Sequence, residues 1–140
     1  MERATYESYL AAFNARDYDR VLSFWDDGAV EVAFAGYAFR SKQAIRDFYG
    51  FFHDYVREEI AIHHYVANDR MIALEATVRL TGIKPLTPSL LAPQGLDGLA
   101  TPDVGQVIEI PQFIHYHLRD GRFATAVCAV SGPVTATGGA

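Results

Sequence analysis

The chain has 140 residues, of which 50% are hydrophobic and 13% aromatic, and its formal net charge is −5. This length fits one domain that buries roughly two-thirds of the surface its unfolded chain exposes. The acidic balance and the scattered basic residues disfavour a nucleic-acid or anionic-membrane partner. No stretch approaches the ~18 apolar residues of a membrane span, and the N-terminal sequence MERATYESYL is not typical of a signal peptide. The lone Cys128 excludes an internal disulfide, so we expect a cytoplasmic protein.

The first third of the chain predicts three helices. Apolar residues at spacings of three to four predict an amphipathic helix over residues 4–15. Asp17 is suited to cap a second helix and Ser41 to cap a third. Residues 29–34, between the second and third helices, predict a short strand.

From residue 57 onward the apolar period changes to two, which is typical of strands. Residues 57–67 and 70–81 predict one hairpin, with Asn68-Asp69 at its turn. Residues 106–119 and 122–131 predict a second hairpin, joined by Asp120-Gly121, a strong hairpin signal.

The segment between the hairpins, residues 84–105, is rich in Pro, Gly and Leu. A loop of this length in a small domain is typical of a functional lid, and its leucines favour a packed flap. Residues 134–140 have no periodicity and are expected to fray. We therefore expect a single domain over residues 1–133, with an inserted lid loop at 84–105 and a flexible tail at 134–140.

The register of the first hairpin predicts which side chains face the core. If Asn68-Asp69 is a two-residue turn, His63 pairs with Leu74, and Tyr65 shares their face because directly paired residues point the same way. This face is the more apolar one on the second strand. His63 is therefore predicted to point inward, towards the helices.

The register of the second hairpin predicts an inward face and an outer face. Gln112 and Tyr116 are the polar members of the inward set, which continues with Thr125, Val127 and Ala129 on the partner strand. The opposite face is too apolar for a solvated sheet surface, so we expect a homodimer packed through it. That outer face is predicted to carry Val107, Glu109, Phe113, His115, His117, Ala124, Ala126, Cys128 and Val130.

The order of these elements resembles the NTF2-like superfamily, in its SnoaL-like and ketosteroid-isomerase-like branch. The residues that carry the resemblance are YLAAFNARDYDRVLSFWDDGAVEV, AIRDFYGFF, VANDRMIALEATVRLTG and the turn RDGRF. Together they cover most of the chain outside the 84–105 insertion. The resemblance implies a cone-shaped α+β fold (cystatin-like), in which a curved antiparallel sheet packs against three N-terminal helices around a pocket.

The resemblance also bears on the site residues. Ketosteroid isomerases use an aspartate base, together with a tyrosine and a protonated aspartate that bind the developing oxyanion. Tyr9 corresponds to that tyrosine, whereas Val32 and Ile114 stand where the two acids are expected. Dehydratases of the superfamily place histidines and tyrosines in the pocket, and an inward His63 beside Tyr65 is similar to them in residue type.

The candidate catalytic residues are His63 and Tyr9. An imidazole near neutral pH serves as a general acid or base, and a tyrosine hydroxyl donates a hydrogen bond to a substrate oxygen. The alternatives are a buried histidine satisfied by a tyrosine hydroxyl and an ordinary helix aromatic. The expected substrate-binding residues, each of which could equally be plain core, are Phe13, Trp25, Phe34, Phe48, Phe52, Tyr65, Leu74, Gln112 and Tyr116.

Histidines elsewhere suggest no metal site. His64, His115 and His117 could share one sheet face, but no carboxylate spacing accompanies them, and interface histidines are commoner than such a zinc site. His53 lies at the end of the third helix, where a protonated imidazole suits the helix dipole. We therefore expect no metal and no cofactor.

The sequence thus predicts a SnoaL-like small-molecule enzyme. The expected reaction is an isomerisation, a dehydration (a lyase reaction) or a cyclisation, by general acid/base proton transfer on an apolar, oxygen-bearing substrate. The alternative is a non-catalytic dimer that binds a small ligand or serves as a scaffold.

Overall fold

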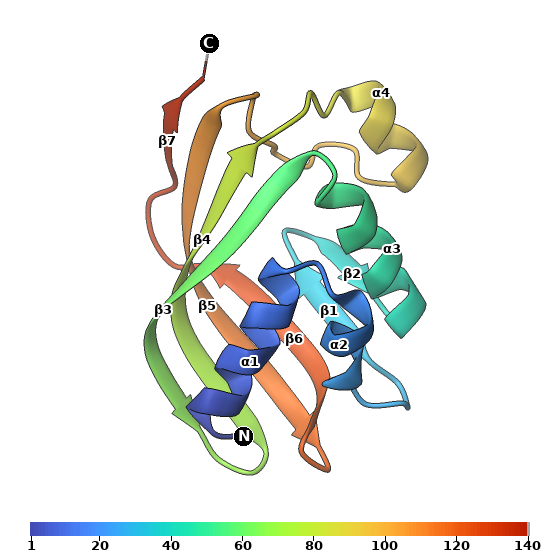
Figure 1. The fold of residues 1–140 in the computed structure, drawn as a ribbon, viewed down its shortest axis with the longest axis vertical. Coiled ribbons are helices and arrows are strands. Elements are labelled where there is room, and N and C mark those ends of the chain that lie inside the picture. The colour runs from blue at the N-terminus through green and yellow to red at the C-terminus, as the bar shows by residue number, and fades with distance from the viewer. Residues whose placement is uncertain (140) are drawn as a thin grey trace.

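The structure, a computed structural model, describes residues 1–139 as one curved sheet with its long helices on one face (Figure 1). The helices are α1 (Arg3–Asn14), α2 (Tyr18–Ser23), α3 (Lys42–Phe52) and α4 (Pro88–Leu91), and α4 leads into the 3₁₀ turn η1 (Ala92–Gln94). The strands are β1 (Glu31–Phe34), β2 (Tyr37–Phe39), β3 (Val56–Ala67), β4 (Met71–Gly82), β5 (Gln106–Arg119), β6 (Arg122–Val130) and β7 (Thr135–Gly138). The predicted α+β class is confirmed.

Both predicted helix caps are present. The Asp17 side chain accepts a hydrogen bond from the Arg20 amide, and the Ser41 hydroxyl accepts one from the Ala44 amide. Each bond satisfies one of the amides that a helix leaves without a partner at its start. The second helix is shorter than the predicted one: α2 ends at Ser23, and Trp25 instead forms an isolated bridge with Phe123 of β6.

The sheet runs in the order β2-β1-β6-β5-β4-β3, and only the β1–β6 pair is parallel. Strand β2 is absent from the sequence prediction. It pairs with β1 through a tight turn in which Ala35 and Gly36 both have positive φ, of 49° and 84°. The two turn residues are Ala-Gly, which is not one of the usual Asn-Gly or Asp-Gly hairpin signals, and alanine seldom adopts a positive φ. The sequence therefore contained no indication of this turn.

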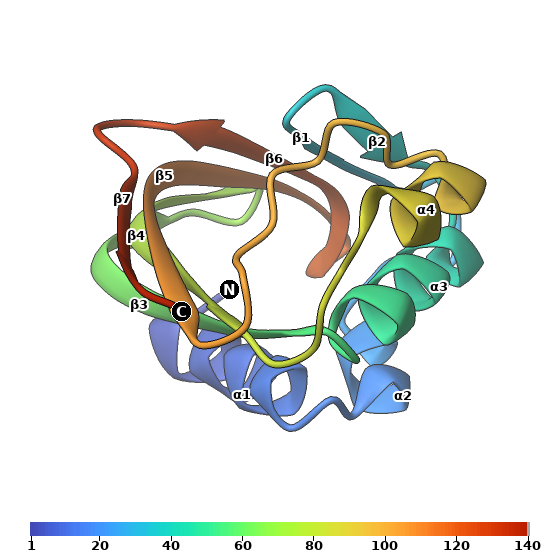
Figure 2. The same cartoon turned by 90° about the horizontal axis from the view of Figure 1, so that it is seen from above.

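The two long hairpins curl around the space opposite α1 and α3 (Figure 2). Their concave face meets the helices in a core in which Tyr6, Phe123 and Val56 are each 0% exposed. The Arg119 guanidinium, near the far end of β5, pairs with Asp26 beyond α2 at 2.7 Å. This ion pair holds the tip of the β5–β6 hairpin against the helical layer, and Arg119 keeps the pKa of Asp26 below its usual range.

The segment after β4 is ordered by burial of its leucines, including Leu86, Leu91 and Leu96. The hydroxyl of Tyr37, on β2, donates a hydrogen bond to the Asp97 carbonyl at 2.5 Å. Figure 2 shows this segment arching between the sheet and α3. The buried leucines thus hold this segment against the rest of the domain.

The C-terminal tail differs from the expected frayed segment. Thr135–Gly138 form β7, which pairs with residues 106–109 at the start of β5. The pairing is available because β6 ends at Val130 and leaves that stretch of β5 without a neighbour on one side. Main-chain pairing at an open sheet edge does not require apolar periodicity, so the sequence carried no signal for it. Among the described residues, no helix is long and apolar enough to cross a membrane.

Candidate functional site

A cavity of about 540 Å³ lies between the concave sheet face, the helices and the segment after β4. Its walls are almost entirely apolar or aromatic, and Glu58 is the one charged residue among those that line it in the described part of the chain. A cavity of this size and character suits a small apolar ligand held by a few polar groups. Leu99 and Ala100 close it from the lid side, and Val130 and Val134 stand at its rim.

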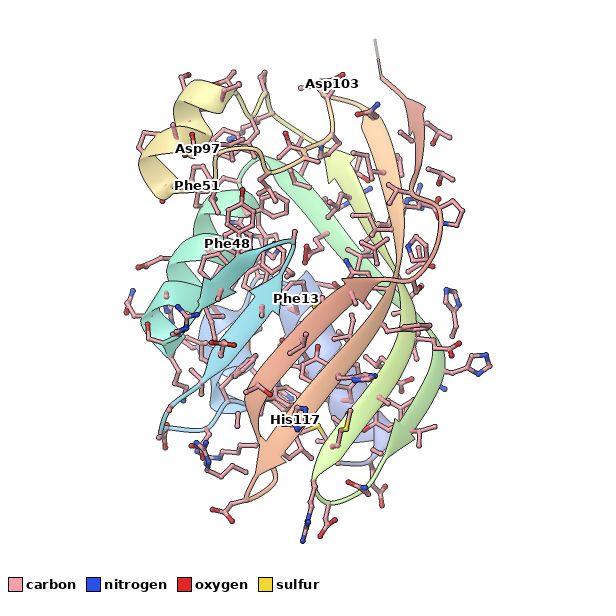
Figure 3. All side chains as sticks on the ribbon, turned by 180° about the vertical axis from the view of Figure 1, so that it is seen from behind. Phe13, Phe48, Phe51, Asp97, Asp103 and His117 are labelled. Carbon is pink, nitrogen blue, oxygen red and sulfur yellow. The ribbon has the colours of Figure 1, made fainter. Side chains whose placement is uncertain are left out.

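Most of the residues proposed from sequence line this cavity. Figure 3 shows Phe13 and Phe48 lying in the space between the helices and the sheet. The residues from the sequence proposal that line the cavity are Tyr9, Phe13, Trp25, Phe34, Phe48, Phe52, Gln112 and Tyr116.

Two of the proposed ligand contacts, Tyr65 and Leu74, lie elsewhere. They pair with one another across β3 and β4. The Tyr65 ring packs against Tyr6 of α1, and its hydroxyl donates to the Met1 carbonyl. Leu74 is 1% exposed in the core. The side chains of Tyr65 and Leu74 were both predicted correctly to point inward. They pack in the core on the side of α1, however, and neither of them lines the cavity.

The predicted inward orientation of His63 is wrong. The β3–β4 register shifts between Ile62 and His64, so that His63 is an extra residue in a β-bulge. Its Nε2 atom lies 2.7 Å from the Thr77 hydroxyl on the outer, exposed face of the sheet. A bulge lets two residues of one strand oppose a single residue of the other, which a strict alternation of faces does not anticipate.

The same bulge brings Glu58 into the cavity. Before the bulge, Ile60 pairs with Val78 and Glu58 with Leu80, on the inward face of β4. A strict alternation of faces through His63, without the bulge, would instead place Glu59 inward and Glu58 on the outer face. The Glu58 side chain is 13% exposed, against 45% for Glu59. The bulge therefore decides that Glu58, and not Glu59, enters the cavity, and no local sequence signal for it is evident.

A second bulge changes the inner face of β6. The register of β5 and β6 shifts between His117 and Leu118, which leaves Ala124 as the extra residue. Ala126, Cys128 and Val130 therefore pair with inward residues of β5 and line the cavity. The prediction that Thr125, Val127 and Ala129 face inward is wrong for the same reason, although Ala129 touches the cavity at its edge.

Three tyrosines line the cavity: Tyr9, Tyr49 and Tyr116. Burial raises the pKa of each phenol above its ordinary value, so the hydroxyls remain neutral donors at physiological pH. Tyr116 is already engaged, with its hydroxyl 2.9 Å from that of Tyr6. Tyr49 was not proposed from sequence, although it adjoins the apolar stripe of α3 that contains Phe48 and Phe52.

Two further polar groups face the interior. The Trp25 indole nitrogen is buried and has no hydrogen-bond partner among residues 1–139. Cys128 lines the cavity, and burial raises the pKa of its thiol to about 12. A thiol with so high a pKa is not a nucleophile at neutral pH.

Glu58 has a buried neighbour behind the cavity. His53, just after α3, is 6% exposed, and its Nε2 atom lies 3.8 Å from Glu58 Oε2. Its Nδ1 atom lies 2.9 Å from the Tyr18 hydroxyl. His53 was assigned only a helix-end role from sequence, because its proximity to Glu58 arises from the tertiary fold.

The histidines on the outer face do not form a metal site. No group of three or more His, Cys, Asp or Glu side chains within residues 1–139 is arranged to hold a metal ion. His117 lies on the outer side of the sheet (Figure 3), and His64 is 3.9 Å from Glu75. The cavity residues offer a carboxylate, hydroxyls, an amide and an indole, a set suited to proton transfer and hydrogen bonding.

Comparison with solved structures shows the same fold in proteins of several kinds. A predicted polyketide cyclase from Silicibacter sp. TM1040 has a TM-score of 0.71 and 22% identity, covering 91% of this chain and 87% of that one. An LEH-like epoxide hydrolase from M. tuberculosis has a TM-score of 0.64 and 17% identity, with 89% and 78% covered. A computationally designed 17-OHP binder has a TM-score of 0.65 and 12% identity, with 94% and 92% covered. At these identities the likeness shows the fold alone, and it confirms the NTF2-like fold.

A search among curated proteins finds no match. The sequence profile of the SnoaL-like domain, in contrast, matches residues 6–126, which include most of α1, all of α2 and α3, and the long hairpins as far as Ala126 in β6. The chain therefore belongs to the SnoaL-like domain family of the NTF2-like superfamily.

Proposed function

We propose that this protein is a small-molecule enzyme that isomerises, dehydrates or cyclises an apolar, oxygen-bearing substrate by proton transfer in the cavity. One observation carries the proposal: Glu58, the one charged residue lining the described cavity, is almost excluded from solvent and faces an apolar wall set with tyrosine hydroxyls. A carboxylate so placed is suited to take a proton from a bound substrate. The family and its cyclase and epoxide hydrolase neighbours support a small-molecule enzyme.

The polar groups divide between two roles. Glu58 accepts a proton from a carbon beside a substrate carbonyl, and the electron pair of that C–H bond moves towards the carbonyl oxygen. Tyr9 and Tyr49 donate hydrogen bonds to the oxygen as its charge develops. Glu58 then returns the proton to another carbon, which gives isomerisation, or to a departing hydroxyl, which gives dehydration with release of water. His63 has no part in this scheme because it lies outside the cavity.

A second candidate is ligand binding without catalysis. The designed 17-OHP binder shares this fold, and the cavity wall of the present chain is predominantly apolar. A bound ligand would use Tyr9, Gln112 and the aromatic wall formed by Phe13 and Phe48. The two candidates differ in whether the carboxylate of Glu58 exchanges protons with the ligand.

The test uses 2-tetralone, an apolar ketone with exchangeable protons beside its carbonyl. We expect the wild-type protein to accelerate exchange of these protons for deuterium, as followed by NMR. We expect Glu58→Gln to slow the catalysed exchange by about 10²-fold or more, since the amide cannot serve as a base. The matched control is Glu59→Gln, one residue along and on the opposite face, which should leave the rate unchanged. Binding without accelerated exchange would favour the ligand-binding alternative, and equal rates for the Glu58 variant and wild type would refute the role of Glu58.

We also propose that the working unit is a homodimer in the cytoplasm, packed through the outer sheet face. This face carries Phe113 and Val127, which are 47% and 45% exposed, and Val66 at 70%. Ala73 and His115 link Val66 and Val127 into one row across β3, β4, β5 and β6, and Phe113 lies in the neighbouring row, two residues before His115 on β5. An apolar sheet face of this extent suits a second copy of the same face related by a two-fold axis.

Val127→Glu tests the dimer, because a two-fold interface places the new charge on both subunits. Sedimentation at micromolar concentration should give the mass of two 15.5 kDa chains for the wild type and of one for the variant. Leu90→Glu, on α4 and away from the sheet face, should remain dimeric. A monomeric wild type at that concentration would rule the dimer out.

A further inference from the structure

The inference concerns a buried imidazole that the scheme above does not use. His53 packs edge-on against Phe13 of α1, with ring centroids 5.1 Å apart, and it stacks on Tyr18 of α2. Its Nε2 atom is buried and has no hydrogen-bond partner within residues 1–139. A buried polar atom without a partner is destabilising, so this position calls for an explanation.

The surroundings of Tyr18 indicate which ring nitrogen of His53 carries a proton. The Tyr18 hydroxyl has three neighbours: Arg16 Nε at 3.2 Å, the Tyr49 carbonyl at 3.1 Å and His53 Nδ1 at 2.9 Å. The guanidinium only donates and the carbonyl only accepts. All three contacts are satisfied together if the hydroxyl donates its single proton to the carbonyl and accepts from Arg16 and from a protonated Nδ1. Tyr18 therefore favours a proton on Nδ1.

With Nδ1 protonated, the neutral ring presents the Nε2 lone pair to Glu58 Oε2, which lies 3.8 Å away. A lone pair and a carboxylate facing one another in a buried place repel. One proton between them removes the repulsion, either on the carboxyl group or on Nε2 as an imidazolium. A single proton leaves the pair with no net charge, which suits a mostly apolar cavity.

We propose that His53 and Glu58 share one proton at the cavity wall, and that Tyr18 orients the imidazole for this purpose. The proposal rests on the proposed function, in which Glu58 is the group that meets the substrate. With the proton on Nε2, Glu58 is a carboxylate that can accept a substrate proton. With the proton on Glu58, the same group is an acid that can protonate a departing oxygen, while Nε2 is left with its lone pair. His53 is a positioning residue, since it acts through Glu58.

No other charge competes strongly for His53. From α1 it meets Phe13, from α3 it meets Tyr49 and Phe52, and from β3 it meets Glu58. The nearby Arg16 and Asp54 pair with one another at 2.8 Å, so their charges offset each other. The protonation of His53 is therefore tied chiefly to Glu58 and Tyr18.

The first experiment is ¹⁵N NMR of the full chain with labelled histidine, with His53→Gln used to assign the signal among the five histidines. We expect Nδ1 of His53 to carry a proton, while Nε2 reports the shared proton. Glu58→Gln should remove that Nε2 signature, and the neighbouring Glu59→Gln should leave it intact. Tyr18→Phe should release the preference for a proton on Nδ1. A neutral ring with its proton on Nε2 throughout, unaffected by Glu58→Gln, would overturn the proposal.

The second experiment links the pair to catalysis through the pH profile of 2-tetralone exchange. Removing the partner of the shared proton should make the Glu58 carboxylate harder to form, so His53→Gln should move the half-maximal rate to higher pH. Tyr18→Phe, at a half-exposed position, provides the same test with less risk to folding, and should move the profile in the same direction. An unshifted profile in both variants would overturn the proposal while leaving the role of Glu58 intact. A pair seen by NMR in a protein that does not catalyse exchange would refute the proposed function instead.

Discussion

Replacing Phe123 by alanine should lower the free energy of unfolding by about 3–5 kcal/mol. The ring is 0% exposed, and its centroid lies 4.6 Å from that of Tyr116 and 4.8 Å from that of Tyr9. It also packs edge-on against Trp25, so its removal leaves a hole where α1, α2 and the sheet meet. A loss of this size is a large part of the ~5–15 kcal/mol that stabilises a typical domain.

Urea denaturation followed by circular dichroism measures this effect. Lys84→Ala is the control, because Lys84 is exposed in the segment after β4 and a surface truncation of this kind usually changes stability by about 0.5 kcal/mol or less. A loss below about 1.5 kcal/mol for Phe123→Ala would show that neighbouring rings close the hole. The aromatic cluster would then be less rigid than its packing indicates.

Replacing Gly82 by alanine should displace the end of the lid and destabilise the fold by about 1–3 kcal/mol. A Cβ atom at Gly82 would overlap the carbonyl oxygen of Asp103, which is backbone and cannot rotate away. Gly82 also forms a bridge with Val104, and its carbonyl accepts from the Gly105 amide at 2.9 Å. The lid therefore returns to β5 by passing directly over the main chain of Gly82.

Hydrogen–deuterium exchange of peptides covering residues 99–105 should rise in the Gly82 variant, and 2-tetralone should bind more weakly because Leu99 and Ala100 line the cavity. Gly50→Ala is the matched control: that glycine lies in α3, nothing lies within 4 Å of an added Cβ, and alanine favours helices. It should be neutral or stabilise by up to about 1 kcal/mol. Unchanged exchange at 99–105 in the Gly82 variant would mean that the lid does not depend on this close approach.

Local sequence signals accounted for α1 to α3, β1 and the four long strands, because each of these elements depends on a few neighbouring residues, whereas β2 and β7 were missed. The caps Asp17 and Ser41 hydrogen-bond amides three residues away. The strand pattern of residues 71–82 alternates buried and less buried side chains along its whole length. The order and spacing of these elements also led to the correct family.

The site was predicted only in part, and the reason is visible in β3. The aromatic residues of α1 and α3 were placed at the cavity because helix periodicity fixes which of them face the sheet. The polar residues of the strands depend on register, and a single extra residue reverses every face beyond it. The bulge at His63 thus exchanged Glu59 for Glu58 and removed His63 from the site.

The sequence by itself determined the helices, the long hairpins, the apolar composition of the cavity and the family to which the chain belongs. Tertiary structure decided which polar groups enter that cavity and which of them meet. The bulges at His63 and Ala124 shift the register within the two long hairpins, and the approach of His53 to Glu58 joins the end of α3 to the start of β3. These outcomes depend on packing across the whole sheet, and for that reason no local pattern of residues foretells them.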